Sequence, residues 1–374
     1  MRQPVFEMER WQSLHDNEVE YNLSESGVLP FTLAEFRELA GVDPDDTVLG
    51  YGQTDGTAGL RERIAAMFRD ASAAHVIATT GSAEANFVAL WRLVEPGDRV
   101  VVVQPAYAQT PGLARGLGAE VVDLWLEEGR GWQPAPGAAR ELIAEGTKLV
   151  VVTNPNNPTG SVLSEEAATE IVEAAASRGA WILADEVYAG AELSGTRTAS
   201  FWGRTDRVLV TGSLSKAYGL PGLRLGWVVG PEEWRGELWA RKDYTTIAPA
   251  ALSDRLAAAA LKPGVRRRIL ERSRGLLRAN LATLSDWASE LAGTLRFRPP
   301  AAGAIAFFGY DLPPGSAQLA ERLRVEESVL IVPGTHFGVD GYFRIGYGYE
   351  GARLAAALAR VTRVLSGLGA GTSV

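Results

Sequence analysis

The chain has 374 residues, 46% of them hydrophobic and 22% charged, a composition typical of a globular protein. Its length predicts two unequal domains with a cleft between them, because single domains commonly hold about 100 to 200 residues. A formal net charge of −8 disfavours nucleic acid and acidic membranes as partners, since both attract basic surfaces. The absence of cysteine and the three scattered histidines disfavour disulfides, a thiolate nucleophile and a bound metal.

The first residues lack the apolar stretch that signal peptides have. The chain begins Met1-Arg2-Gln3-Pro4 and turns charged at Glu7. No run approaches the roughly 18 apolar residues of a membrane span. We therefore expect a cytoplasmic protein that does not cross a membrane.

Residues 46–262 alternate short apolar segments, rich in β-branched residues, with longer helical ones. This alternation predicts a large domain with a mostly parallel, seven-stranded sheet that is covered by helices on both faces. Helices are expected over residues 83–94 and 164–178, the second introduced by acidic residues that suit a helix N-terminus. The seven expected strands are His75–Thr79, Arg99–Val103, Glu120–Leu124, Lys148–Thr153, Trp181–Asp185, Val208–Thr211 and Leu225–Val229.

The pattern changes after Pro263. A long, charged, amphipathic segment over residues 265–291 predicts a helix, and another helix is expected over residues 350–365. This part predicts a smaller α+β domain over residues 263–374, with residues 1–45 packing against it. Its expected strands are Thr294–Phe297, Ala304–Tyr310, Val329–Val332 and Tyr342–Gly346.

The segment over residues 213–227 carries the strongest chemical signal. It directly follows an expected strand and contains Ser213, Ser215, Lys216 and Arg224. Removal from water favours the neutral amine of a lysine, which can then condense with an aldehyde. The serines and the arginine supply hydrogen-bond donors for a phosphate. A single lysine in a polar loop is more often a surface residue, so the assignment depends on the segments around it.

Three other segments support this interpretation. The Asn-Pro-Asn-Asn-Pro-Thr-Gly segment over residues 154–160 follows an expected strand, where open α/β sheets bind ligands. Asp185 ends another strand, where it can pair with a protonated pyridine nitrogen, and Tyr188 follows. Residues 79–85 form a strand-to-helix turn whose N–H groups would point at an anion. Taken singly, these segments are equally typical of a turn, a helix cap and an ordinary strand-to-helix joint.

In this order and spacing, the segments resemble the pyridoxal 5′-phosphate (PLP) enzymes of fold type I, and specifically the class I/II aminotransferase family. The resemblance extends from about Tyr51 to Tyr347, and its most specific part is the pattern Ser-x-Ser-Lys-x-x-Gly-x-x-Gly-x-Arg. It implies a fold type I α/β enzyme that holds PLP as a Schiff base on Lys216. The implied reaction transfers the amino group of an L-amino acid to a 2-oxo acid.

The resemblance also implies roles for individual residues. Lys216 would act as the general base as well as the anchor of the cofactor. Asp185 would pair with the pyridinium nitrogen, and Asn157 and Tyr188 would hydrogen-bond the phenolic oxygen of the ring. Tyr107 would stack on the ring. The residues implied to hold the phosphate are Ser82, Ala83, Ser213, Ser215 and Arg224.

Further residues are implied to contact the substrate or a second subunit. Arg344 would bind the α-carboxylate of the substrate as a fork, with Asn157 beside it. Gly27 lies in a segment that often covers the substrate in this family. Tyr51 matches the segment that reaches the phosphate of the neighbouring subunit, so a homodimer is implied.

The reaction itself stays open between several alternatives. Residues 24–28, 32–39 and 213–227 are also similar to capreomycidine synthase, a family member that cyclises a hydroxylated arginine rather than transaminating. Glu25 would suit a cationic side chain, although a solvated loop glutamate is equally consistent. A PLP-dependent lyase or acyl-CoA condensing enzyme would share the lysine and the aspartate. A non-enzymatic regulator would need a DNA-binding domain, for which the acidic first 45 residues leave no room.

Overall fold

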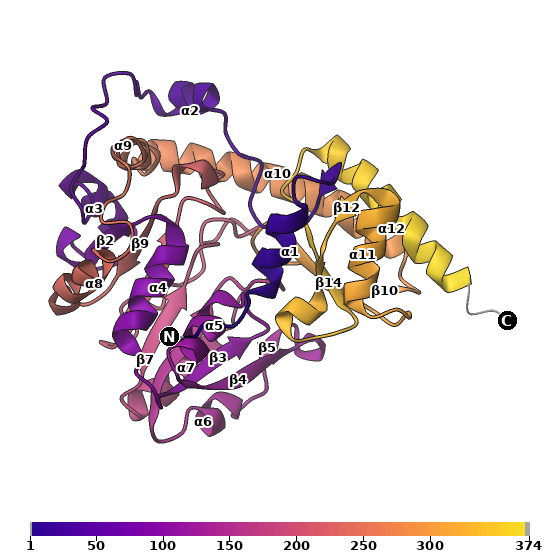
Figure 1. The fold of residues 1–374 in the computed structure, drawn as a ribbon, viewed down its shortest axis with the longest axis horizontal. Coiled ribbons are helices and arrows are strands. Elements are labelled where there is room, and N and C mark those ends of the chain that lie inside the picture. The colour runs from indigo at the N-terminus through magenta and orange to yellow at the C-terminus, as the bar shows by residue number, and fades with distance from the viewer. Residues whose placement is uncertain (1, 371–374) are drawn as a thin grey trace.

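The computed structural model describes residues 2–370 of the chain. Figure 1 shows a larger body that contains an eight-stranded sheet and a smaller body built mainly from the C-terminal part of the chain. The long helix α10 (Pro263–Glu290) runs along both bodies. None of the helices within residues 2–370 combines the length and the apolar character needed to span a lipid bilayer.

The eight-stranded sheet contains all seven expected strands and one more. Strands β8, β7, β6, β3 and β4 pair in parallel, whereas β9 runs antiparallel to both of its neighbours, β8 and β2. The additional strand, β5, is only two residues long and pairs antiparallel with β4. In spatial order the strands are β2 (Val76–Thr79), β9 (Gly226–Val229), β8 (Val208–Ser213), β7 (Trp181–Asp185), β6 (Thr147–Thr153), β3 (Arg99–Gln104), β4 (Glu120–Glu127) and β5 (Gln133–Pro134).

Both faces of this sheet are buried. Along β3, Val100 and Val102 pack into one hydrophobic cluster, whereas Val101 and Val103 pack into the other. Continuous apolar strands of this kind require helices on both sides. Helices α4 (Gly81–Leu93), α5 (Gln109–Gly116) and α8 (Arg235–Lys242) contribute to the first cluster, and α6 (Ala138–Leu142) and α7 (Glu165–Ser177) to the second. Polar chemistry is therefore confined to the edges of the sheet.

The smaller body is built on a four-stranded antiparallel sheet. Its strands, in spatial order, are β10 (Leu295–Phe297), β11 (Ile305–Tyr310), β14 (Tyr342–Gly346) and β13 (Val332–Pro333). Within residues 2–370, the remaining α-helices are α1 (Glu7–His15), α2 (Leu33–Ala40), α3 (Ala58–Ala65), α9 (Ala251–Ala260), α11 (Ser316–Glu327) and α12 (Gly351–Ala370). The domain boundaries expected after residues 45 and 262 remain predictions.

The expectation of one strand over residues 329–332 was wrong. Residues Val329–Leu330 form β12, which pairs in parallel with β1 (Tyr21–Asn22) in a separate two-stranded sheet. The next strand, β13, pairs instead with β14. The chain changes partner at the buried Ile331, so one apolar run serves two sheets.

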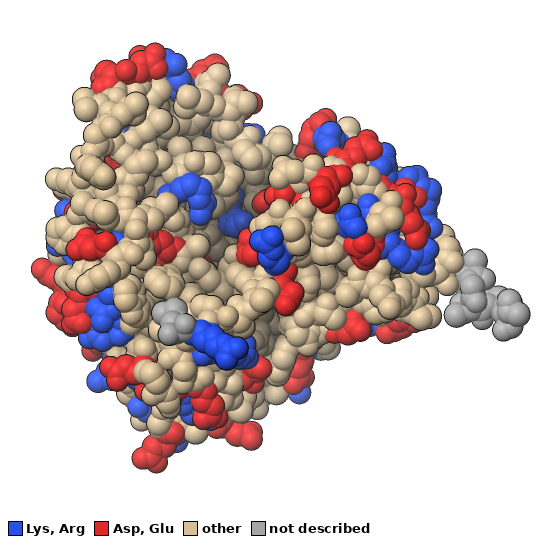
Figure 2. Space-filling view, viewed as in Figure 1, with Lys and Arg blue, Asp and Glu red and all other residues tan. Residues whose placement is uncertain are grey.

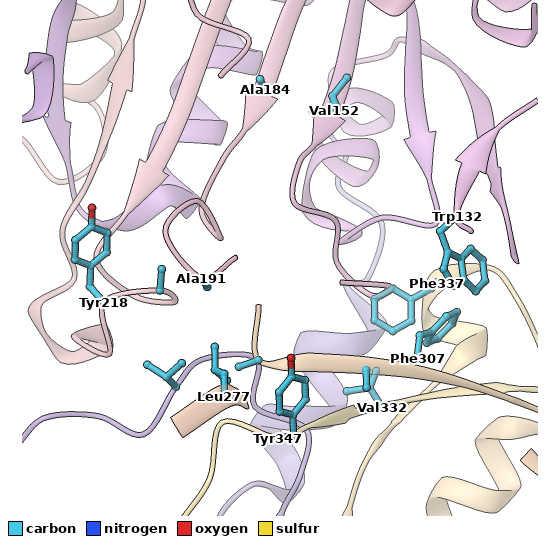
Figure 3. Close-up of a cluster of buried hydrophobic side chains, with 14 of the residues drawn as sticks. Trp132, Val152, Ala184, Ala191, Tyr218, Leu277, Phe307, Val332, Phe337 and Tyr347 are labelled. Atoms are coloured by element: carbon cyan, nitrogen blue, oxygen red, sulfur yellow. The ribbon is translucent and has the colours of Figure 1, made fainter. Parts of the chain in front are cut away.

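Aromatic side chains join the two bodies beside the site described below. Trp132, next to β5, packs against Phe307 of β11 with their ring centroids 5.7 Å apart. Phe337 lies 5.7 Å from Phe307 on another side. Figure 3 shows these three side chains gathered between the strands of the larger sheet and the smaller sheet. Pairs of this kind contribute about 0.5 to 1.5 kcal/mol each beyond area burial. The Trp132–Phe307 pair links the two bodies, and Phe337 supports Phe307 within the smaller one.

Candidate active site

The segments with chemical signals meet at one edge of the eight-stranded sheet. The carboxyl ends of β6, β7 and β8 lie side by side there, with Thr153 paired to Asp185 and Asp185 paired to Thr211. Because β9 is antiparallel, its first residue, Gly226, lies at the same edge, opposite Thr79 of β2. The loops that follow these strands therefore surround one volume, as expected for the carboxyl edge of an α/β sheet.

A cavity of about 360 Å³ lies at this edge. Its volume is in the range of sites for small molecules and cofactors. Figure 2 shows the surface hollowed between the two bodies, with basic and acidic side chains around the hollow. The expected site residues that line the cavity are Ser82, Ala83, Tyr107, Asn157, Asp185, Tyr188, Ser215, Lys216 and Arg224.

Two of the expected residues lie just behind the lining. The Oγ of Ser213 accepts the backbone N–H of Ser215 at 3.2 Å and is buried. Arg344 donates from Nη1 to Oδ1 of Asn157 at 2.9 Å, and Asn157 faces the cavity. Their expected contacts with cofactor and substrate remain predictions.

The other two expected residues have contrasting positions. A Cβ built on Gly27 would lie 3.9 Å from Cδ of Lys216, so this segment covers the stem of the lysine. Tyr51 lies on the outer surface with 91% of its area exposed, in a β-bridge to Ala250. Within one chain it is not part of the cavity lining.

Asp185 presents a buried carboxylate to the cavity. Its Oδ2 accepts Nδ2 of Asn86 at 2.9 Å, and its Oδ1 accepts the N–H of Val187 at 3.1 Å. Burial raises the pKa of this carboxyl, against the opposing effects of these two bonds and of the Lys216 charge. A carboxylate held in this way favours a cationic ligand, because a paired positive charge offsets the desolvation of the anion.

The start of helix α4 faces the same cavity without a side-chain cap. Its N-cap residue, Thr80, makes no capping bond, and Ser82 and Ala83 line the cavity. Arg224 lies against this turn, since a Cβ on Gly81 would meet its Nη2 at 2.5 Å. Unpaired N–H groups at a helix N-terminus, together with a guanidinium, form a binding site for an anion such as a phosphate.

The geometry of this anion site depends on close backbone approach. A Cβ built on Gly226 would lie 2.6 Å from the backbone N of Ser82, so any side chain there would displace the turn. Arg224 adopts a left-handed backbone conformation with φ of 44°, which is uncommon for a residue other than glycine. From this position its Nη1 donates to the Oγ of Ser215 at 3.2 Å.

Arg344 carries a buried charge whose partners are neutral. It is 1% exposed and donates to Asn157 and to the carbonyl oxygen of Ser24. In the described part of the chain no carboxylate lies within 4.0 Å of its guanidinium, and its Nε has no partner. Burial lowers its pKa. A buried, unpaired guanidinium is costly, so this arrangement favours an anionic ligand beside Asn157.

Several lining residues were not expected from the sequence. Helix α1 forms one wall of the cavity, and Tyr107 donates its hydroxyl to Glu9 on that helix at 2.7 Å. Burial, followed by the charge of Glu9, raises the pKa of Tyr107. Asn86 also lines the cavity, and its Oδ1 accepts the hydroxyl of Thr211 at 2.7 Å. An asparagine on the buried face of a helix is a signal that could have indicated its role, since buried amides need partners.

The sequence of the chain matches a known protein family. The family model described as aminotransferase class I and II matches residues 13–361. The chain belongs to the class I and II aminotransferase family. It is therefore a PLP-dependent enzyme, as the sequence resemblance implied.

Relatives within this family differ in the reactions that their names describe. Capreomycidine synthase from Streptomyces vinaceus is 33% identical over 373 residues, which cover 97% of this chain and 94% of the relative. A crystal structure of a PLP-dependent aminotransferase from Streptococcus suis is 33% identical, with a TM-score of 0.92 and coverage of 98% and 99% of the two chains. A crystal structure of the PLP-dependent cyclase OrfR is 29% identical, with a TM-score of 0.89 and 98% coverage of both. The expected fold is confirmed.

The residues at the cavity fit PLP. The uncapped helix start, Ser215 and Arg224 suit its phosphate, and the buried carboxylate of Asp185 suits a ring nitrogen that carries a proton. Lys216 lies in the same cavity, and its charge acts on Asp185. An amine, an anion site and a carboxylate around one volume of this size are what the cofactor requires.

Proposed function

We propose that the enzyme is an aminotransferase that moves the amino group of an L-amino acid to a 2-oxo acid at the cavity around Lys216. The observation that carries this proposal is the convergence of Lys216, Asp185 and the start of α4 on one cavity, with Arg344 behind it. When bound, PLP supplies an aldehyde that condenses with amines and a ring that withdraws electrons.

Side chains of the protein would bind the cofactor and the substrate and transfer the proton. Lys216 would hold the cofactor, and its freed Nζ would move a proton from Cα of the substrate to the carbon that PLP contributes as its aldehyde. Asp185 stabilises the positive charge on the ring nitrogen. Arg344 and Asn157 fix the substrate carboxylate, which sets the orientation of the bonds at Cα. Tyr188 and Asn157 donate hydrogen bonds to the ring oxygen.

The experiment that tests this proposal is a half-reaction screen with the purified holoenzyme and a panel of L-amino acids. An aminotransferase will release a 2-oxo acid and accumulate pyridoxamine phosphate until a second 2-oxo acid is added. Transamination would be contradicted if an amino acid of the panel is converted to a product while no member of the panel yields pyridoxamine phosphate.

One observation favours a second candidate, the cyclisation of a hydroxylated arginine. Besides Asp185, three carboxylates line the cavity, those of Glu9, Asp16 and Glu25, whereas its basic lining residues are Lys216 and Arg224, both assigned to the cofactor. An acidic wall of this kind suits a substrate with a cationic side chain. Arginine and its hydroxylated forms therefore belong in the screen, and a cyclic product that keeps its α-amino group would favour this candidate.

The acidic wall predicts a preference for cationic amino acids. Asp16→Asn and Glu25→Gln will each lower kcat/KM for arginine by up to about fivefold, the magnitude of a solvent-exposed ion pair, and leave alanine unaffected. Steady-state kinetics with both substrates measures the change. Glu18→Gln is the matched control, because this exposed glutamate lies outside the cavity lining. An equal loss for arginine and alanine would contradict the assignment.

We also propose that the enzyme is a homodimer in which Tyr51 reaches the site of the partner. Val48, Leu49 and Tyr51 are strongly exposed on one segment, and Tyr244 is 83% exposed near the segment that Tyr51 bridges at Ala250. Exposed apolar clusters of this kind mark protein interfaces. A cytoplasmic location remains part of this proposal.

Mixing two inactive variants tests the contribution of Tyr51. Tyr51→Ala and Lys216→Ala each damage every site of a homodimer. If Tyr51 acts across subunits, mixed dimers will contain one site with both residues intact, and activity will reappear after the variants are unfolded and refolded together. Refolding each variant alone is the control. Mixed samples without restored activity would show that Tyr51 acts within its own subunit, and an active Tyr51→Ala protein would show that it does not act at all.

A further inference from the structure

Glu84 is a buried carboxylate that the proposed mechanism does not use. It is the fourth residue of helix α4, is 8% exposed and lies one residue beyond the turn that faces the cavity. Within residues 2–370, no lysine, arginine or histidine nitrogen lies within 4.0 Å of it. A buried carboxylate without a cation is costly unless hydrogen bonds replace its water.

Four donors satisfy this carboxylate. Its Oε2 accepts the backbone N–H of Thr80 at 2.6 Å. Its Oε1 accepts the hydroxyl of Thr245 and both the N–H and the hydroxyl of Thr246, the latter two at 3.2 and 2.8 Å. A carboxylate offers about four acceptor positions, so four donors match its overall capacity, although three of them converge on Oε1. Thr80 adds a direct bond from its own hydroxyl to that of Thr246, at 2.9 Å.

These bonds join two segments that are far apart in the sequence. Thr80 is the N-cap residue of α4, and its φ of −82° and ψ of 75° differ from the extended conformation usual at this position. The opposite side of the same turn packs on Gly226. The start of α4 is therefore held between β9 on one side and Glu84 with the loop of residues 244–247 on the other.

The loop of residues 244–247 is itself braced. Lys242 donates from Nζ to the carbonyl oxygen of Ile247 at 2.7 Å and to that of Thr54. Ile247 has a φ of 63°, an unusual conformation for a β-branched residue, so the loop depends on these contacts. Its hydrogen bonds converge on Glu84, at the turn that carries Ser82.

We infer that Glu84 is a positioning residue for the phosphate of PLP, which holds the N–H groups of Ser82 and Ala83 toward the cavity by fixing Thr80 to Thr245 and Thr246. This inference rests on the proposed cofactor site. The charge of Glu84 would repel a phosphate rather than attract it. Its contribution must therefore come from geometry, and a role in geometry predicts a defect specific to the phosphate.

The test compares PLP with pyridoxal, which has the aldehyde and ring but no phosphate. Glu84→Gln replaces one carboxylate oxygen, an acceptor, by an NH₂ group, a donor. This donor would face either the N–H of Thr80 or the donors of Thr245 and Thr246. It will weaken PLP by about ten- to a hundredfold, and pyridoxal by a much smaller factor. Spectroscopic titration of the cofactor-free protein measures both dissociation constants. Inorganic phosphate will compete with PLP less well in the variant than in the wild type.

Two further variants make the test decisive. Thr246→Val removes the two bonds of the Thr246 hydroxyl, to Glu84 and to Thr80, and keeps the carboxylate. It will show the same selective loss of PLP affinity, but a smaller one. This variant provides the test if Glu84→Gln fails to fold. Glu237→Gln, which breaks a surface contact between α8 and Arg92 of α4, is the matched control and will leave both affinities unchanged. Equal weakening of PLP and pyridoxal, or no weakening, would overturn the inference. Failure of the wild-type protein to bind PLP through Lys216 would instead contradict the proposed function.

Discussion

Replacement of Lys216 by alanine will abolish turnover and remove the absorption band of the lysine-bound cofactor. The substitution deletes both the amine that anchors PLP and the base that moves the Cα proton. Positioned acid–base catalysis alone contributes about 10²- to 10⁴-fold in rate. Absorbance spectra of the purified variant, recorded with saturating PLP, and single-turnover rates measure the two losses separately.

Lys148→Ala is the matched control for this prediction. Lys148 is an exposed lysine on β6, outside the cavity lining, so the control protein will keep both the absorption band and the activity. An unchanged band in pure Lys216→Ala protein would place the cofactor on another amine.

Asp185→Asn will have opposite effects on catalysis and on the stability of the cofactor-free protein. Removing one partner of a buried charge pair costs about 3 to 5 kcal/mol, which corresponds to a fall in kcat of about 10²- to 10⁴-fold. Without cofactor, however, the buried carboxylate is a burden, because burial raises its pKa above the value in the unfolded chain. The free energy of unfolding of the wild-type apoprotein is therefore lowered as the pH rises from the ordinary range of aspartate through the raised pKa, and it stays lowered above it.

Thermal unfolding of the apoproteins from acid to neutral pH measures this effect. The variant lacks the ionisable group and will unfold at a higher temperature than the wild type at neutral pH, and the difference will shrink as the pH falls. With PLP bound the order will reverse, because the ring cation then pairs with the carboxylate of the wild type. A variant that is less stable than the wild type in both states would show that Asp185 has a structural role.

Most of the large sheet could be predicted from the sequence, because strands buried on both faces are continuous apolar runs. Its strand directions could not be predicted in the same way. Strand β9 is as apolar as its parallel neighbours, and its antiparallel orientation follows from the short loop after Lys216, which returns the chain to the same edge. Strand β5 and the change of strand partner at Ile331 could not be predicted either, because two-residue strands leave no periodic pattern in the sequence.

The cofactor side of the cavity could likewise be predicted, because each residue there lies at the end of a strand or in the segment that follows one. The substrate side could not. Glu9 lies on α1 and Asp16 directly follows this helix, which has no motif, and their position at the cavity depends on contacts between distant parts of the chain. Asn86 lies between these cases, as it is close to the helix start in sequence but is oriented by Asp185 and Thr211.

The docking of α1 has a consequence for how the enzyme is made. Trp11 donates to the carbonyl oxygen of Ile331, 320 residues away, and Tyr21 pairs with Val329. Helix α1 therefore reaches its final position only after residues 329–331 have been synthesised, and contacts so remote in sequence form slowly. A chain without residues 329–331 would lack the contacts that place α1, and with them the wall of the cavity that α1 forms.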